Sequence, residues 1–432
     1  MRTSVSIMFA VWLLALVAPL AVHAASPAET TATRLLDHLD ARQYSQAEAM
    51  FTAEMATAVP ADKLQQVWES LPQQMGAAQG RGTAKVSAHQ DMQVVVVPLQ
   101  YAKAALIAQI AINAEGKVAG FLIQPAPPAP AAAPAADATY KERKFPVGDL
   151  PGTLAMPTTA EKVPAVVLVH GSGPQDRDET IGPNRPFLDI ARGLAEQGIA
   201  VLRYEKRTKA RPQDFASGQY TMDEETTNDA VAAVATLRTT PGIDPEKVYV
   251  LGHSQGGMLA PRIARHSGKV AGLILLAAPA RSLLTILPEQ NHYLLNADGS
   301  INAQEQQFLD QLQQMIANVR SDAAIADKDT PLGLPAHYWR TFDKIDPVAD
   351  ARQLQLPMLL LQGGRDFQVI DTDWQLWRKA FADAPRASFH HYPALNHLGI
   401  TGESPGSLDE YQKPGHVDAQ LIADIAAWVK EH

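Results

Sequence analysis

Three residues of the kinds that carry out nucleophilic catalysis stand far apart in this chain. Ser254 lies within the pentapeptide GHSQG at 252–256, and Asp366 and His397 each follow a separate apolar run farther along. A serine hydroxyl attacks a carbonyl carbon when a histidine takes its proton and an acid holds that histidine in the right tautomer. Serine, acid, histidine is one of the chain orders in which such triads occur. The sequence therefore predicts Ser254 as nucleophile, His397 as base and Asp366 as the acid.

The pentapeptide around Ser254 fits a sharp turn between a strand and a helix. An apolar run, Val248–Leu251, precedes it, and a helical pattern, Gln255–His266, follows it. Such a turn requires minimal side chains two positions before and two positions after the serine, and Gly252 and Gly256 meet this requirement. The serine hydroxyl would then stand at the N-terminus of a helix, whose dipole favours developing negative charge.

Acyl transfer also requires hydrogen-bond donors for the oxyanion of the tetrahedral intermediate. The loop HGSGP at 170–174 directly follows the apolar run Ala165–Val169, where one donor is expected. We assign the role to the backbone N–H of Ser172 and to that of Gln255, the residue after the nucleophile. The alternative is that this loop is only a glycine turn, but its position directly after a strand favours the donor role.

Other acids and histidines near the triad positions compete for the same roles. We expect Asp371 and Asp373 to lie in the cap region of a following helix, a role that aspartates often have. His253 is expected to pack around the turn. Three further histidines are less suitable, because two lie inside an apolar run and one lies in a polar loop: His390, His391 and His416.

Short apolar runs alternate with helical patterns through the second part of the chain. The predicted strands are Ala165–Val169, Ile199–Tyr204, Val248–Leu251, Val270–Leu276, Met358–Leu361 and Ala387–Tyr392. The predicted helices include Phe187–Gln197, Asn228–Thr239, Gln255–His266, Asp373–Ala382 and Ala419–Lys430. Such alternation indicates an α/β fold, a mostly parallel sheet with helices on both faces and its sites at the carboxyl ends of the strands.

A helical lid is expected at about residues 281–350, between two of the predicted strands. An apolar stripe in this segment repeats at helical spacing. The stripe either shapes an acyl pocket or only seats the lid on the sheet, and the second interpretation is favoured for most of it. Its members are Phe308, Leu309, Leu312, Met315, Ile316 and Val319.

A segment made only of proline and alanine, residues 125–136, divides the chain into two folded parts. This composition is typical of a semi-rigid spacer. We predict a small α+β domain at 25–124, a linker at 125–138 and a catalytic domain at 139–432. The small domain should contain three amphipathic helices, followed by strands at Thr83–Val86, Met92–Leu99, Ala104–Ile112 and Lys117–Gln124. Because it holds no cluster of candidate catalytic side chains, the hypothesis for this domain is a role in dimerisation, and hence in a homo-oligomer, or in substrate access.

Residues 1–24 have the pattern of a secretory signal peptide. Arg2 precedes an almost uninterrupted apolar run, Val5–Val22. A membrane anchor is the alternative, because about 18 apolar residues can just span a bilayer. Pro19 and the small residues around Ala24 favour cleavage after Ala24. We therefore expect a periplasmic or secreted protein that has no stable membrane span once the signal peptide is removed.

Composition excludes several other classes of protein. The 432 residues include no cysteine, which excludes a disulfide framework, a cysteine nucleophile and cysteine-ligated metal clusters. The formal net charge of −9 argues against a general nucleic-acid binder, whose surface would be basic. Motifs of the types HExxH, GxGxxG and the P-loop do not occur in the sequence. We therefore expect neither a metal ion nor an organic cofactor.

These motifs together resemble the α/β-hydrolase superfamily and, within it, the EstD-type two-domain carboxylesterases. The resemblance rests on the stretches Gly171–Glu179, Leu202–Arg207 and Gly252–Pro261, and the first part of the chain resembles nuclear-transport-factor-like domains more loosely. It implies a serine esterase that cleaves short acyl esters with the triad named above. Glu205 departs from the aspartate expected at its position. We expect three neighbouring residues to brace the oxyanion loop through ion pairs: Asp176, Arg177 and Asp178.

Other functions remain open at this point. A serine peptidase, an amidase or an acyltransferase would use the same triad, since an acyl-enzyme can form from an amide or pass its acyl group to another acceptor. A non-catalytic binding module is an alternative of a different class. The sequence favours hydrolysis of a small ester substrate, because no β-propeller repeats and no acidic amine-binding motif accompany the triad.

Overall fold

A computed structural model of the protein describes residues 26–89, 91–126, 131–321, 323–403 and 405–432. The expected signal peptide at 1–24 lies outside the described residues. The chain divides into two compact units, Met1–Ala129 and Pro130–His432, and the division falls inside the proline and alanine segment. None of the helices in the described part of the chain combines the length and the apolar character that crossing a bilayer requires.

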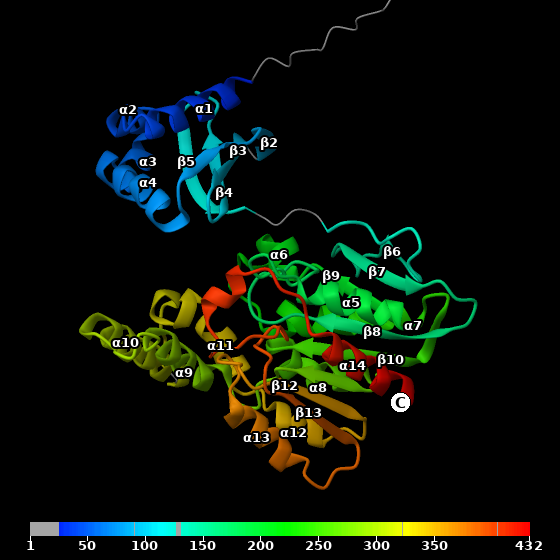
Figure 1. Ribbon diagram of the computed structural model, residues 1–432. Coiled ribbons are helices and arrows are strands. Elements are labelled where there is room, and N and C mark those ends of the chain that lie inside the picture. The colour runs from blue at the N-terminus through cyan, green and yellow to red at the C-terminus, as the bar shows by residue number, and fades with distance from the viewer. Residues whose placement is uncertain (1–25, 90, 127–130, 322, 404) are drawn as a thin grey trace, which may run out of the picture. The chain divides into compact units, whose positions relative to one another are not determined.

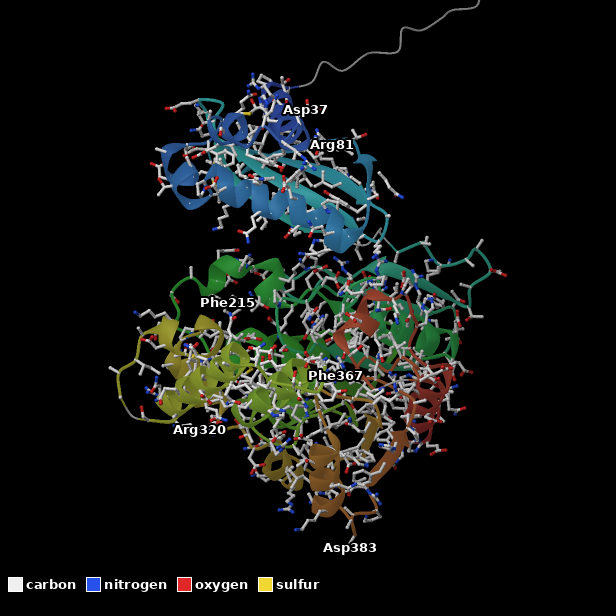
Figure 2. The ribbon with its side chains drawn as sticks, turned by 60° about the vertical axis from the view of Figure 1, so that its left-hand side comes forward. Asp37, Arg81, Phe215, Arg320, Phe367 and Asp383 are labelled. Atoms are coloured by element: carbon white, nitrogen blue, oxygen red, sulfur yellow. The ribbon has the colours of Figure 1, made fainter. Side chains whose placement is uncertain are left out.

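In the described residues of the first unit, four helices pack against an antiparallel sheet of five strands (Figure 1). The helices are α1 (Pro27–Asp40), α2 (Tyr44–Glu48), α3 (Ala53–Ala58) and α4 (Ala61–Met75). The strands are β1 (Ala78–Arg81), β2 (Lys85–His89), β3 (Met92–Tyr101), β4 (Ala105–Ile112) and β5 (Val118–Pro125). One apolar face of α1, including Leu35, Leu36 and Leu39, is fully buried against the sheet. Arg81 pairs with Asp37 and Asp40 across the α1–β1 contact (Figure 2).

The small unit differs from the sequence prediction in two details. Four helices replace the predicted three, because Thr52 caps a separate short helix by accepting a hydrogen bond from the Met55 N–H. Five strands replace the predicted four, because β1 forms at Ala78–Arg81, a polar segment with no apolar pattern. The α+β class of this unit is as predicted.

The second unit is built on a sheet of eight strands in the order β13-β12-β11-β10-β8-β9-β7-β6. The strands are β6 (Tyr140–Lys144), β7 (Gly152–Pro157), β8 (Val163–Val169), β9 (Ala200–Tyr204), β10 (Ile243–His253), β11 (Leu273–Leu276), β12 (Met358–Gly363) and β13 (Ala387–Tyr392). The six predicted strands are parallel, whereas β6 and β7 add an antiparallel pair at one edge. The sequence prediction missed this pair because β6, with the sequence YKERK, is a polar edge strand.

Helices cover both faces of this sheet (Figure 1). Side chains alternate along each strand, so Val167 and Val169 of β8 enter one core while Val166 and Leu168 enter the other. One face is covered by α5 (Pro186–Glu196) and α14 (Ala419–Glu431). The other is covered by α7 (Asn228–Arg238), α8 (Gln255–Ser267) and α13 (Asp371–Ala380). Shorter helical turns are α6 (Arg207–Ala210), η1 (Pro212–Phe215), η2 (Asp223–Thr227) and η5 (Leu408–Gln412).

A helical insertion separates β11 from β12, where the lid is predicted. It consists of α9 (Leu283–Leu295), α10 (Ala303–Arg320), η3 (Asp327–Asp329), η4 (Pro331–Gly333), α11 (Ala336–Phe342) and α12 (Pro347–Arg352). From the apolar stripe of α10, Leu312, Ile316 and Val319 join the main core, whereas Phe308 is 46% exposed. Three of the six stripe residues therefore seat the insertion on the body of the domain.

Asp373 anchors the start of this insertion. Its buried carboxylate accepts hydrogen bonds from the backbone N–H groups of Ala280 and Arg281, at 2.9 and 3.1 Å, and pairs with the Arg281 guanidinium. Asp373 lies in the first turn of α13, as predicted, but its carboxylate does not cap that helix and instead bonds to the loop after β11. Asp371 opens α13 as its first residue, and no side chain caps that helix.

Candidate active site

Ser254 stands at the turn between β10 and α8 in a strained backbone conformation. Its φ angle is +51°, a region that residues other than glycine seldom occupy. A Cβ atom at Gly252 would collide with the carbonyl group of Gly256, and one at Gly256 would collide with the carbonyl oxygen of Val169. The two glycines are therefore required by the close approach of the backbone at this turn, as the sequence motif predicts.

Asp366 and His397 lie in loops at the same carboxyl edge of the sheet as Ser254. Asp366 follows β12, His397 follows β13, and the His397 Nδ1 lies 2.7 Å from the Asp366 Oδ2. The other oxygen, Asp366 Oδ1, accepts the backbone N–H groups of Gln368 and Val369 at 2.8 and 2.9 Å. Both oxygens of this buried carboxylate are thus satisfied. The acid can hold the imidazole with its Nδ1 protonated, which leaves Nε2 free to act as a base.

His253, the residue before the nucleophile, ties the base loop to the turn. Its Nε2 donates to the His397 carbonyl oxygen at 2.8 Å, and its Nδ1 lies 2.9 Å from the Glu179 Oε2. Both ring nitrogens face acceptors, so the doubly protonated imidazolium is the form that satisfies both. Burial alone lowers the pKa of His253, but the Glu179 carboxylate outweighs it and raises the pKa above its ordinary value. His253 therefore positions the His397 loop, beyond the packing role expected of it.

Glu179 is a buried acid to which the sequence analysis assigned no role. Besides His253, it accepts the Gly171 N–H on Oε1 at 2.6 Å. Burial alone raises the pKa of Glu179, yet the charge and hydrogen bond of His253 bring it below its ordinary value. Glu179 also has a positive φ of +52°, which places it in a second strained turn. One carboxylate thus connects the oxyanion loop, the nucleophile turn and the base loop.

The predicted oxyanion loop lies against the nucleophile. A Cβ atom built on Gly171 would lie 3.4 Å from the Ser254 Cβ. Among the described residues, no protein acceptor takes a hydrogen bond from the N–H of Ser172 or from that of Gln255. Gln255 is the first residue of α8, where backbone N–H groups have no partner within the helix. Both predicted donors are thus available to a ligand.

The three residues predicted to brace the oxyanion loop hold it in different ways. Asp178 pairs with the buried Arg203 on β9, and Arg177 pairs with Glu205 at 2.8 Å. Asp176 makes no ion pair in the described structure; its carboxylate instead accepts hydrogen bonds from the backbone of the following turn, at Asp178 and Thr180. The expectation of ion pairs therefore holds for two of the three.

The competing histidines are engaged elsewhere. His390 lies 3.2 Å from an Asp424 carboxylate oxygen, and His416 lies 3.1 Å from the carboxylate of Asp189. His391 packs against the Trp374 ring. Within the described residues there is no group of three histidine, aspartate or glutamate side chains arranged to hold a metal ion.

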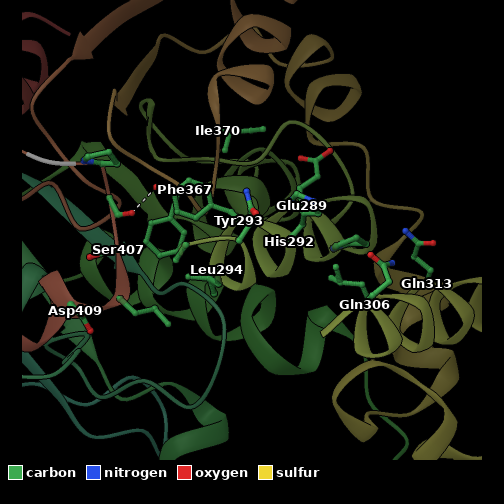
Figure 3. A pocket seen from close by; sticks show the side chains of 17 residues that line it. Glu289, His292, Tyr293, Leu294, Gln306, Gln313, Phe367, Ile370, Ser407 and Asp409 are labelled. Carbon is green, nitrogen blue, oxygen red and sulfur yellow. Dashed lines mark hydrogen bonds between the residues drawn. The ribbon is translucent and has the colours of Figure 1, made fainter. Parts of the chain in front are cut away.

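A cavity of about 910 Å³ lies beside the acid of the triad (Figure 3). Its walls come from α9, α10, the loop after β12 and the segment that leads into η5. Tyr293 of α9 stacks on Phe367, the neighbour of Asp366, with ring centroids 5.1 Å apart. The described lining residues include neither Ser254 nor His397, so this cavity adjoins the catalytic loops without containing them.

Comparison with known proteins agrees with this geometry. A family model described as "Serine aminopeptidase, S33" matches residues 161–404, and one described as a protein of unknown function (DUF3887) matches residues 32–121. Over 397 residues, 91% of this chain and 93% of the relative, the sequence is 34% identical to Esterase EstD of Thermotoga maritima. The fold and site define a serine hydrolase of the α/β type. The chain belongs to the α/β-hydrolase family and is a two-domain homologue of an esterase.

Two of the solved structures that match this chain are from Butyrivibrio proteoclasticus and Pyrococcus furiosus. Est1E of Butyrivibrio proteoclasticus, determined with ferulic acid bound, is 16% identical with a TM-score of 0.43, covering 67% of this chain and 100% of that one. The esterase PF2001 of Pyrococcus furiosus is 16% identical with a TM-score of 0.42, covering 71% of this chain and 96% of that one.

We predict that Glu179→Gln destabilises the fold in a pH-dependent way. Because the pKa of His253 is raised in the folded state, its protonation contributes to the free energy of unfolding below about pH 6.5. This contribution is lost as the pH rises through the folded-state pKa. Because the pKa of Glu179 is lowered in the folded state, its ionised carboxylate contributes to the free energy of unfolding above about pH 4.5. This contribution is lost on acidification through the folded-state pKa. Urea unfolding should therefore show the largest loss, about 3 kcal/mol, near pH 5.5 and a smaller loss near pH 9.

The matched control for this prediction is Glu205→Gln. Glu205 belongs to the same region, but its partner, Arg177, is an arginine and not a histidine. Its effect on the free energy of unfolding should be the same at both pH values. A loss in Glu179→Gln that does not change with pH would contradict the ionised His253–Glu179 pair.

Proposed function

We propose that this protein hydrolyses short-chain acyl esters through a covalent acyl-enzyme on Ser254. The observation that carries the proposal is the hydrogen bond between His397 and Asp366 at the sheet edge that presents the strained Ser254 turn. The 34% identity to Esterase EstD supports an ester as the substrate. The preference for short acyl chains rests on the resemblance of the motif stretches to two-domain carboxylesterases.

Acylation would begin with proton transfer from Ser254 to His397. The Ser254 Oγ forms a bond to the ester carbonyl carbon while the His397 Nε2 takes the hydroxyl proton. Asp366 stabilises the imidazolium through the hydrogen bond to Nδ1. The carbonyl oxygen becomes an oxyanion, which the Ser172 and Gln255 N–H groups accommodate. The bond to the alcohol oxygen then breaks, and His397 returns its proton to the leaving alcohol.

Deacylation repeats these steps with water as the nucleophile. His397 takes a proton from the water as its oxygen attacks the acyl carbon, and a second oxyanion forms in the same place. Collapse of this intermediate breaks the bond to Ser254 and returns the proton to its Oγ. The carboxylic acid leaves, and the enzyme is restored without a metal ion or an organic cofactor taking part in any step.

We predict that Ser254→Ala abolishes ester hydrolysis in a protein that stays folded. Loss of the nucleophile removes the acyl-enzyme pathway, so kcat for p-nitrophenyl acetate should fall by about 10⁴-fold or more. The circular dichroism spectrum should match that of the parent protein, because the substitution removes only the hydroxyl group. The thermal midpoint should be equal to that of the parent protein or higher. A variant with unchanged kcat would contradict Ser254 as the nucleophile.

A second candidate function is amide hydrolysis, which the description of the matching family as a serine aminopeptidase favours. A panel of p-nitrophenyl acetate, butyrate, octanoate and palmitate, measured beside aminoacyl p-nitroanilides, separates the two. We expect the highest kcat/KM with acetate or butyrate and a steady decline with chain length. Hydrolysis of anilides alone would overturn the proposal, and a maximum at palmitate would overturn the short-chain preference.

We also propose that the protein works outside the cytoplasm. The proposal rests on the N-terminal pattern of 1–24, which predicts export and cleavage after Ala24. Mass spectrometry of the exported protein should find Ala25 as the first residue. An intact Met1–Ala24 segment in that protein would contradict cleavage and would favour a membrane anchor.

A further inference from the structure

A buried lysine lies behind the oxyanion loop, in a stretch that the triad leaves without a role. Lys206 lies two residues after the end of β9 and is 2% exposed. Its ammonium group lies 2.7 Å from the Glu225 Oε1 and donates to the Gly171 carbonyl oxygen at 2.9 Å. Burying an ion pair removes both charges from water, and this desolvation cost offsets their attraction, so a pair of this kind is weak support for stability alone. Its position suggests a different purpose.

Lys206 donates to the carbonyl oxygen of the peptide group whose N–H is one of the two oxyanion donors. The Gly171 carbonyl and the Ser172 N–H belong to one planar trans peptide, so they point in opposite directions. A hydrogen bond that fixes the carbonyl toward Lys206 therefore fixes the direction of the Ser172 N–H. A charged donor on the carbonyl also polarises the peptide, which strengthens its N–H as a donor.

The glutamate of the same pair holds the other oxyanion donor. Glu225 Oε1 accepts a hydrogen bond from the Gln255 side-chain amide at 3.1 Å, and Gln255 supplies the second N–H. Glu225 lies on the π-helical turn η2, a rare local geometry that is frequent at functional sites. Its Oε2 accepts the Tyr338 hydroxyl of α11 at 2.8 Å, so the insertion closes the network.

Glu225 is placed to accept hydrogen bonds as a carboxylate. Burial alone raises the pKa of Glu225, but the Lys206 charge and the hydrogen bonds it accepts bring the pKa below its ordinary value. Burial and the Glu225 charge raise the pKa of Tyr338, which keeps its hydroxyl proton available for donation. The carboxylate therefore has a donor on each oxygen.

We propose that the Lys206–Glu225 pair positions the two oxyanion donors, Ser172 through the Gly171 carbonyl and Gln255 through its side chain. This inference rests on the proposed function, because it assigns the pair to the transition state of acyl transfer. Neither member of the pair is bonded to Ser254, and both act through Gly171 and Gln255, so they are positioning residues. Its loss should weaken the binding of the oxyanion more than the binding of the intact ester.

The test measures kcat and KM for p-nitrophenyl acetate in Lys206→Met and in the double variant Lys206→Met/Glu225→Gln. The double variant leaves no unpaired buried charge, so it keeps the comparison valid if the single variant does not fold. We expect kcat to fall about 10- to 100-fold in the double variant while KM changes less than about two-fold. An aryl trifluoromethyl ketone, whose carbonyl becomes an oxyanion when the Ser254 Oγ adds to it, should bind more weakly by a similar factor.

Arg265→Met is the matched control. It removes a cation that pairs with the buried Asp350 and is not bonded to Gly171, Gln255 or Glu225. It should leave kcat and the ketone affinity within about two-fold of the parent protein.

A double variant with unchanged kcat, or one in which KM and kcat change together while the ketone affinity stays the same, would overturn the positioning role. Failure of the proposed function is distinguishable, because the parent protein would then show no Ser254-dependent ester hydrolysis at all.

Discussion

The close approach of backbone at Ser254 is the constraint on which the rest of the site depends. A non-glycine residue with a positive φ persists only where its surroundings hold it. Here β10 and α8 are both buried, and the Ser254 N–H donates to the Leu276 carbonyl at 2.9 Å. The strands on either side therefore maintain the turn. As a result of this turn, the Ser254 hydroxyl and the first N–H of α8 lie together at the carboxyl edge of the sheet.

Two buried pairs of opposite charge converge on a single residue, Gly171, next to this turn. Glu179 accepts the Gly171 N–H, and Lys206 donates to the Gly171 carbonyl. A loop glycine has large conformational freedom in the absence of such partners. With one charged side chain bonded to its N–H and another to its C=O, Gly171 is held at both of its backbone polar groups. Rigid donors of this kind stabilise a developing charge without reorganising during the reaction.

The sequence was most informative where a residue's type and its local pattern decide its place. The predicted fold class is confirmed, and the apolar runs before Ser254, Asp366 and His397 are parallel strands of one sheet. The polar strands β1 and β6 were missed, because edge pairing leaves no apolar pattern. Glu179, Lys206 and Glu225 received no role for a related reason. In a sequence, a buried charged residue cannot be distinguished from an exposed one. The burial becomes evident only when the structure shows a partner that is distant in the chain, such as His253 for Glu179.

The two residues proposed to activate Ser254 follow the last two strands of the sheet in chain order. Asp366 follows β12 and His397 follows β13, which is the outermost strand on its side. During synthesis the turn at Ser254 is complete more than a hundred residues before its base has been made. A nascent or truncated chain therefore carries a serine that cannot be activated. Under the proposed mechanism, ester hydrolysis therefore requires the chain through the loop that follows β13.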